Sequence, residues 1–280
     1  MKNILLALMT AAVMMFSGCS SKEATPGYTG PAEINTYFVA PLMSTEEVTS
    51  KLQSAGFEIV AVDKVGKNKL DSIVFTNDYL KGLANKPTRG FLAGALRVLV
   101  DTENNTTRIS NPQYFTKAFL QDDYKLGDAQ PLLDSLNQAF DNLKPSEDQW
   151  SFDGLADYHF MIGRPYYQDQ IVAGEGNTTD LIAKMDSAKK KDIVFKLEVG
   201  EGRTLYGVKL NSRTMKFVDK IGVQNAGILP WMILIENNKA TALRADYMIA
   251  ISYPLLDLGG FMGIMTVPGA VEKDVSKYFK

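Results

Sequence analysis

The chain has 280 residues, of which 45% are hydrophobic and 22% charged. This is the length and composition of a globular protein with about two domains, which excludes a disordered, collagen-like or coiled-coil chain. The 30 basic and 32 acidic side chains leave a net charge of −2, so no broad cationic surface exists for nucleic acid. A single histidine and a single cysteine argue against a Cys/His zinc site, a disulfide framework and a Cys-His catalytic pair, and no cofactor is expected.

The chain begins with a pattern typical of a secretory signal peptide, which we expect to span residues 1–18. Lys2 supplies the basic start, and an apolar stretch follows from Ile4 to Phe16. This stretch is shorter than the roughly 20 residues that a helix needs to cross a bilayer. We therefore expect the segment to be removed rather than to span a membrane.

The residues that end this segment resemble the lipobox of bacterial lipoproteins. The motif is Phe16-Ser17-Gly18-Cys19, and it departs from the family pattern at Phe16, where Leu is usual. The resemblance implies cleavage before Cys19 and lipid attachment to its thiol; an ordinary cleavage site beside an incidental cysteine is the alternative. Ser20 stands where Asp would retain a lipoprotein at the inner membrane, so the periplasmic face of the outer membrane is favoured. Residues 19–32 are rich in Ser, Pro and Gly, which predicts a flexible tether.

The first half of the mature chain, expected to form a domain at 33–145, alternates strand and helix patterns. Its first helix opens with Ser44 and Glu47, spaced as a capping box, and would end at Gly56. Asn104 and Asn105 suit the tight turn of a hairpin. The other expected elements are strands at 36–40, 57–63, 73–77 and 95–100, a strand that ends at Pro112, a closing helix at 127–143 and an inter-domain linker at 144–148.

The second half, expected to form a domain at 150–280, repeats this order at a nearly constant offset. The helix that starts at Thr45 has a counterpart at Thr179, which lies 134 residues later. The remaining matches are strands at 207–211 and 230–235, an Asn-Asn turn at 237–238, a strand end at 251–254 after a longer hairpin, and a closing helix at 270–279. A strand at 158–162 would open this half. Matches in the same order predict an internal duplication.

The first half also resembles the bacterial family catalogued as domain of unknown function 302. The shared features are the helix start at Thr45–Val48, the exit at Gly56-Phe57, the strand 96–100 and the run Ile109-Ser110-Asn111-Pro112. The second half fits more loosely, because Trp231-Met232 stands where the family has Leu-Arg. The resemblance implies an α+β fold made of two copies of a β-α-β4-α unit similar to that of the TATA-binding protein, each an antiparallel sheet with helices on one face, packed as a pseudo-dimer. It implies no activity.

Candidate catalytic groups are few. His159 is the chain's one imidazole, and a periplasmic enzyme would have to use it as a general base together with carboxylates. A hydrogen-bonded structural histidine is the simpler interpretation, since no nucleophile motif accompanies it. Met262 and Met265, with Met161 nearby, could supply soft ligands for Cu(I), although methionine more often fills a core.

The segment 255–267 is apolar, rich in glycine and poor in charge, so we expect it to be buried, to line a cavity or to contact a partner. Within it, Phe261, Met262 and Met265 are candidate ligand-binding residues, and Tyr166 and Tyr167 could add an aromatic rim. The sequence as a whole therefore predicts a lipid-anchored, non-catalytic envelope protein that binds an apolar small ligand or an envelope protein partner. The alternatives are an enzyme that uses His159 and a copper-binding protein.

Overall fold

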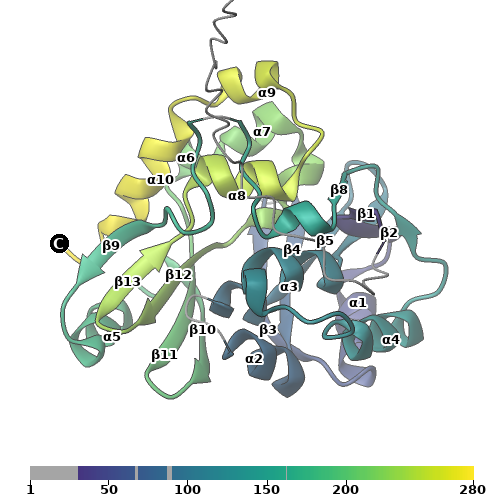
Figure 1. Ribbon diagram of the computed structural model, residues 1–280, viewed down its shortest axis with the longest axis horizontal. Helices are drawn as coiled ribbons and strands as arrows, with labels where there is room; N and C mark the ends of the chain where they lie inside the picture. The colour runs from purple at the N-terminus through teal and green to yellow at the C-terminus, as the bar shows by residue number, and fades with distance from the viewer. Residues whose placement is uncertain (1–30, 67–68, 87–89, 162) are drawn as a thin grey trace, which may run out of the picture. The chain divides into compact units, whose positions relative to one another are not determined.

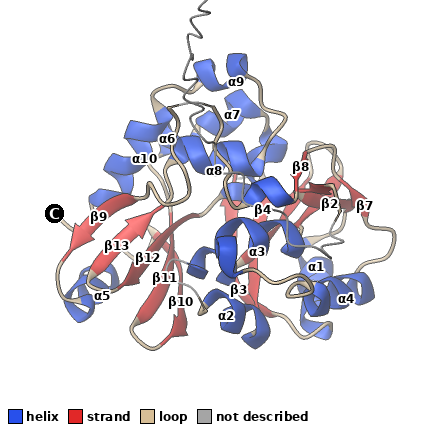
Figure 2. Cartoon of the chain, viewed as in Figure 1, coloured by secondary structure: helices blue, strands red, loops and turns tan. Residues whose placement is uncertain are grey.

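The computed structural model describes residues 31–280 except 67–68, 87–89 and 162, and these residues form one compact unit. The expected signal peptide, the lipid-attachment residue Cys19 and the tether up to residue 30 lie outside the described residues. The described chain is an α+β protein, in which helices pack on antiparallel sheets (Figures 1 and 2). The α+β class predicted from the sequence is confirmed.

The first half of the described chain forms a six-stranded sheet in the order β3-β4-β5-β6-β2-β7, and every neighbouring pair is antiparallel. The strands are β2 (Tyr37–Pro41), β3 (Glu58–Val65), β4 (Leu70–Thr76), β5 (Leu96–Asp101), β6 (Thr106–Ser110) and β7 (Lys144–Pro145). All six residues of β5 are buried, as expected for a central strand.

The second half forms a five-stranded antiparallel sheet in the order β10-β11-β12-β13-β9. Its strands are β9 (Ile171–Glu175), β10 (Ile193–Gly200), β11 (Arg203–Val208), β12 (Trp231–Glu236) and β13 (Lys239–Ala242). A separate pair joins β1 (Glu33–Asn35) to β8 (Gln149–Ser151). Apart from β7, the two sheets have the same strand order. In each sheet the four strands that follow the opening strand lie side by side in chain order. The opening strand, β2 or β9, pairs with the last of these four, β6 or β13.

Helices follow the strands in both halves. They are α1 (Thr45–Ser54), α2 (Asp78–Ala84), α3 (Pro112–Leu120), α4 (Gln130–Ala139), α5 (Thr178–Asp186), α6 (Ser212–Met215), α7 (Phe217–Ile221), α8 (Ala245–Ser252), α9 (Leu258–Gly263) and α10 (Val267–Ser276). Short 3₁₀ turns are η1 (Gly90–Gly94), η2 (Gln121–Asp123), η3 (Asp153–Leu155) and η4 (Val223–Ile228). Helix α1 packs on β3 and β4, and α5 packs on β12 and β13. Within the part of the chain that the structure describes, no helix has the length and hydropathy that a bilayer crossing requires.

Local sequence signals explain where several elements begin and turn. The hydroxyl of Ser44 accepts a hydrogen bond from the backbone N–H of Glu47 at 3.1 Å, which caps α1 as its sequence predicts. The side chain of Asn111 caps α3 by accepting the N–H of Gln113. Pro112 occupies the first helical turn, where the backbone N–H that proline lacks would have no partner within the helix. In the two hairpins, Asn105 and Asn238 adopt φ of 56° and 61°, a left-handed conformation that asparagine tolerates better than most residues.

Three expected elements are wrong. Residues 251–254 end helix α8 rather than a strand, and the second hairpin is not longer than the first, since α8 begins 133 residues after α3. The segment 158–161 contains no strand, and β9 is the strand that opens the second sheet. The segment 144–148 is not a free linker, because β7 pairs with β2 and the Ser146 N–H donates to the carbonyl of Tyr37 at 2.9 Å.

The two halves are joined by buried hydrogen bonds to backbone carbonyls. Ser72 Oγ on β4 donates to the carbonyl of Leu229 at 2.6 Å. Tyr114 Oη on α3 donates to the carbonyl of Ile251 at 2.6 Å. Each donor is buried and cannot reach solvent, so the carbonyl of the other half takes the place of the water molecule that would accept its hydrogen bond in the unfolded chain. The core therefore runs continuously from one half into the other.

Candidate functional site

An exposed apolar surface lies on and around α9. It consists of Leu255, Leu258, Met262 and Met265, which are 60%, 53%, 57% and 62% exposed, and it is called the α9 surface below. The helix starts where the carboxylate of Asp257 accepts a hydrogen bond from the N–H of Gly260 at 2.7 Å. Because α9 is short and one of its sides packs in the core, its other side faces solvent. Contiguous exposed apolar side chains of this kind mark interaction surfaces in soluble proteins.

A hollow of about 120 Å³ opens at the α9 surface. Its lining residues come from α8, α9, the turn after α9, the start of α10 and one arginine before them: Arg164, Asp246, Ile249, Leu258, Phe261, Met262, Ile264, Met265 and Pro268. Phe261 is buried and stacks on Phe160 with ring centroids 4.0 Å apart. Phe261 therefore brings one ring of a packed aromatic pair to the lining, beside the flexible thioether side chains of Met262 and Met265.

The structure brings together Phe261, Met262 and Met265, but it places the two candidate tyrosines elsewhere. Tyr167 is buried, and its ring stacks on Phe119 with centroids 5.8 Å apart, so it belongs to the core. Tyr166 is exposed beside His159, with ring centroids 4.5 Å apart. Neither tyrosine lines the hollow.

Sequence reasoning missed the two charged residues of the hollow, Arg164 and Asp246. Asp246 is buried, and its carboxylate accepts hydrogen bonds at 3.2 and 3.1 Å from the guanidinium of Arg244. Arg164 is exposed. The Arg-Pro pair at 164–165 was the only sequence feature that drew attention to Arg164. Its spacing does not connect it to the α9 segment, which lies almost a hundred residues later.

His159 is half-buried, and its Nδ1 lies 3.5 Å from the carbonyl of Asp157. Among the described residues, no group of three or more His, Cys, Asp or Glu side chains is placed to hold a metal ion. Met262 and Met265 share the hollow, whereas Met161 is not among the residues that line it.

A larger cleft, of about 620 Å³, lies between α2 and the turn that joins β10 to β11. Three of its charged residues have partners within the chain: Lys81 Nζ lies 2.7 Å from the carboxylate of Asp78, and Arg203 donates to the carbonyl of Asn85 at 3.0 Å. The Lys81 ammonium hydrogen-bonded to Asp78 lowers the pKa of that carboxyl. Exposed pairs of this kind are typical of a solvated surface.

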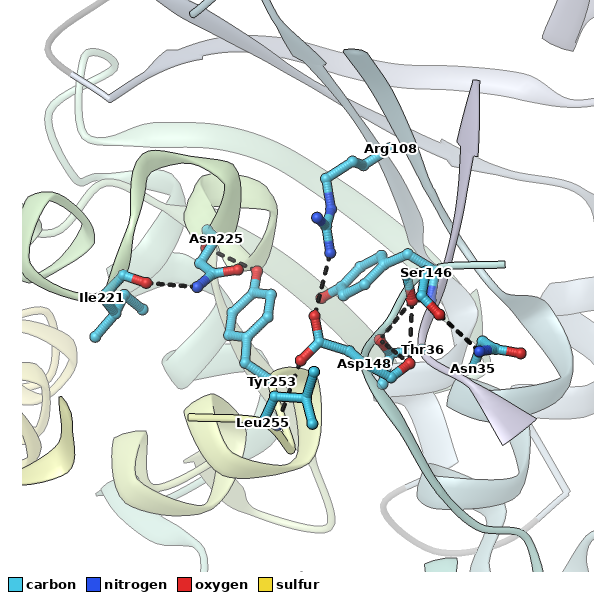
Figure 3. Close-up of polar contacts among 10 residues, drawn as sticks. Asn35, Thr36, Arg108, Ser146, Asp148, Ile221, Asn225, Tyr253 and Leu255 are labelled. Carbon is cyan, nitrogen blue, oxygen red and sulfur yellow. Dashed lines mark hydrogen bonds and ion pairs between the residues drawn. The ribbon is translucent and has the colours of Figure 1, made fainter. Parts of the chain in front are cut away.

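Asp148 connects the α9 surface to the first half of the chain (Figure 3). Its carboxylate lies 3.3 Å from the guanidinium of Arg108 on β6 and accepts the N–H of Leu255 at 3.4 Å. Its backbone carbonyl accepts the N–H of Thr36 at 3.0 Å. Burial raises the pKa of Asp148, and the charge of Arg108 opposes that rise. In the sequence this aspartate falls at the end of the run 144–148, which was expected to be an inter-domain linker.

The described residues define an α+β protein with one exposed apolar surface at α9 and buried polar contacts between its two halves. No family model, no curated protein and no solved structure matches the chain. A function for it is therefore inferred from its own residues.

Proposed function

We propose that the chain is a lipid-anchored, non-catalytic protein of the bacterial envelope that binds a partner protein through the α9 surface. The observation that carries this proposal is the exposure of Leu255, Leu258, Met262 and Met265, each more than half exposed within one short segment. Removing four such side chains from water would supply a substantial driving force for association.

The size of the hollow favours an apolar segment of a protein over an apolar small molecule as the companion. Small-molecule sites are typically about 300 to 1,000 Å³ and enclose most of the ligand. The hollow holds about 120 Å³, which suits one or two inserted side chains. A single aromatic or aliphatic anchor from a partner would fill it and cover the surrounding methionines.

We further propose that the two halves are related domains at 33–145 and 150–280, folded as a pseudo-dimer. The support is that corresponding elements begin at offsets of 133 to 135 residues: β2 and β9, α1 and α5, β3 and β10, β4 and β11, β5 and β12, β6 and β13, α3 and α8. The strand orders correspond as well. The resemblance to domain of unknown function 302, with its unit similar to the TATA-binding protein, is part of this proposal and adds no activity.

The anchor rests on Cys19 and its lipobox-like neighbours, and it is tested separately. Replacement of Cys19 by Ser should abolish incorporation of labelled fatty acid and release the protein from the membrane fraction. Ser20→Asp should keep the lipid label and shift the protein to the inner membrane. An unchanged membrane fraction for Cys19→Ser would refute the lipid anchor.

The binding surface is tested by photo-crosslinking in intact cells from a benzophenone side chain at position 262. The matched control is position 172, because Val172 on β9 is also half exposed and lies outside the α9 surface. A discrete protein adduct at 262 that is absent at 172 and is lost in Met265→Glu is expected. Identical adducts from both positions, or an adduct to a small molecule only, would refute a protein partner at this surface.

A further inference from the structure

Arg164 is the only cation among the described residues that line the hollow at the α9 surface. Its backbone is held in place, because its N–H donates to the carbonyl of Met161 at 2.9 Å and the next residue, Pro165, is buried. Its side chain is exposed, and no residue within the described ranges forms an ion pair or hydrogen bond with its guanidinium. A positioned guanidinium therefore borders the hollow with its N–H donors left to solvent.

The acidic residue of the hollow does not neutralise Arg164. Asp246 is only 4% exposed, and its two carboxylate oxygens accept hydrogen bonds from the guanidinium of Arg244 at 3.2 and 3.1 Å. This pair forms between the first turn of α8 and the residue before the helix, so it is complete without Arg164. The other residues of the lining are apolar. A group of opposite charge for Arg164 therefore has to come from outside the described residues.

The charges at the two ends of α9 also favour an anionic companion. At its last residue, the ammonium of Lys220 donates to the carbonyl of Gly263 at 2.8 Å, and a carbonyl offsets only part of a full positive charge. At its start, the carboxylate of Asp257 already accepts the N–H of Gly260. Two cations and one carboxylate thus border the apolar surface, and this excess attracts a negatively charged partner and repels a positive one.

Filling the hollow makes the charge of Arg164 decisive. An apolar side chain inserted into this space of about 120 Å³ would displace water from the guanidinium that lines it. A charge that loses water without gaining a partner of opposite sign is strongly disfavoured. A purely apolar segment would therefore bind poorly, whereas a carboxylate beside the inserted side chain would replace the hydrogen bonds that the guanidinium loses.

We propose that the partner segment carries a carboxylate next to its inserted apolar side chain, and that this carboxylate pairs with Arg164. The inference rests on the proposed function, because it requires a protein partner at the α9 surface. A guanidinium presents two parallel N–H donors, which match the two oxygens of a carboxylate. An acidic side chain and the C-terminal carboxylate of the partner offer the same chemistry, and the experiment distinguishes them.

The test repeats the photo-crosslinking from position 262 in intact cells with the charge of Arg164 changed. Arg164→Glu should lower the yield of the protein adduct at least about fivefold, because it places like charges in contact. Arg164→Lys keeps the charge and should retain most of the adduct. The matched control is Lys191→Glu, which changes the net charge equally at an exposed position between α5 and β10 and should leave the yield unchanged.

Mass spectrometry of the adduct locates the partner residue that reacts with position 262. An Asp, a Glu or the chain end within a few residues of it is expected. When the carboxylate is a side chain, its replacement by Lys should restore the adduct to Arg164→Glu, because both charges are then reversed. When it is the chain end, one residue added there should abolish the adduct of the unmodified chain.

The outcomes separate this inference from the function on which it rests. The absence of a protein adduct from position 262 of the unmodified chain would overturn both. Three results would overturn only the pairing with Arg164: a smaller loss of yield in Arg164→Glu, an equal loss in Lys191→Glu, or an adduct that maps to a segment without a carboxylate. Equal unfolding midpoints of the purified variants show that the fold is retained, so that a lost adduct reports on binding.

Discussion

The hydroxyl of Tyr114 on α3 donates a hydrogen bond of 2.6 Å to the backbone carbonyl of Ile251 on α8, and both residues are completely buried. The bond joins the first half of the chain to the second within the buried core. Burial also raises the pKa of Tyr114 well above its usual range, so the phenol remains a donor.

We therefore expect Tyr114→Phe to lower the free energy of unfolding by about 1 to 3 kcal/mol, because it leaves a buried carbonyl without its donor. The control is Tyr79→Phe, since the hydroxyl of Tyr79 also donates to a carbonyl, that of Asp128 at 2.8 Å, but from an exposed position. It should change stability by less than about 0.5 kcal/mol. Urea denaturation of both variants measures the difference, and equal losses would contradict the assignment.

A second prediction concerns the carboxylate of Asp148, which accepts the N–H of Leu255 and pairs with Arg108. Asp148→Ala removes both acceptors and should cost about 1 to 2 kcal/mol. Asp148→Asn keeps a neutral acceptor and should cost less, because the raised pKa indicates that desolvation of the charge outweighs its attraction to Arg108. Glu147→Ala, at the exposed neighbouring position, is the control and should be neutral.

The same raised pKa predicts how stability depends on pH. A folded-state pKa above the unfolded value means that the folded chain binds the proton more tightly, so the contribution of Asp148 is greatest at low pH. It is lost as pH rises through the raised pKa. The free energy of unfolding of Asp148→Asn should therefore improve relative to the unmodified chain between about pH 4 and pH 7. If the free energy of unfolding of Asp148→Asn instead falls relative to that of the unmodified chain over this range, the attraction between Asp148 and Arg108 outweighs the desolvation of the carboxylate.

Sequence patterns predicted the parts of the fold that depend on neighbouring residues. The cap at Ser44 and the turn residue Asn105 follow from local hydrogen bonding and backbone preference, and both are confirmed. Helix α8 was missed because all eight of its residues are buried, so it shows no polar side and no helical period.

The candidate site shows the same division. Phe261, Met262 and Met265 lie close in sequence, and composition alone indicated that their segment was unusual. The role of Asp148 was not predictable, because its partners Thr36, Arg108 and Leu255 are far from it in the chain. The exposure of Met262 was also unexpected from its type, since apolar residues are usually buried.

A last prediction follows from the number of buried bonds between the halves. Tyr114 donates to Ile251, Ser72 to Leu229 and Arg97 to Pro230, so each half buries groups that only the other half satisfies. Separated halves would expose these donors together with apolar core, and neither should unfold cooperatively alone. A suitable cut lies in the exposed turn at Gly163, after β8, because β8 pairs with β1 of the first half.

The measurement is fragment complementation with residues 31–163 and 164–280. Each fragment alone should aggregate or give a broad, non-cooperative thermal transition, and an equimolar mixture should regain a single sharp one. Tyr114→Phe in the first fragment should weaken complementation, whereas Tyr79→Phe should leave it unchanged, because only the first of these hydroxyls bonds to the other fragment. A fragment 31–163 that unfolds cooperatively by itself would show that the first half is independently stable and that the buried bonds to the second half are dispensable for its fold.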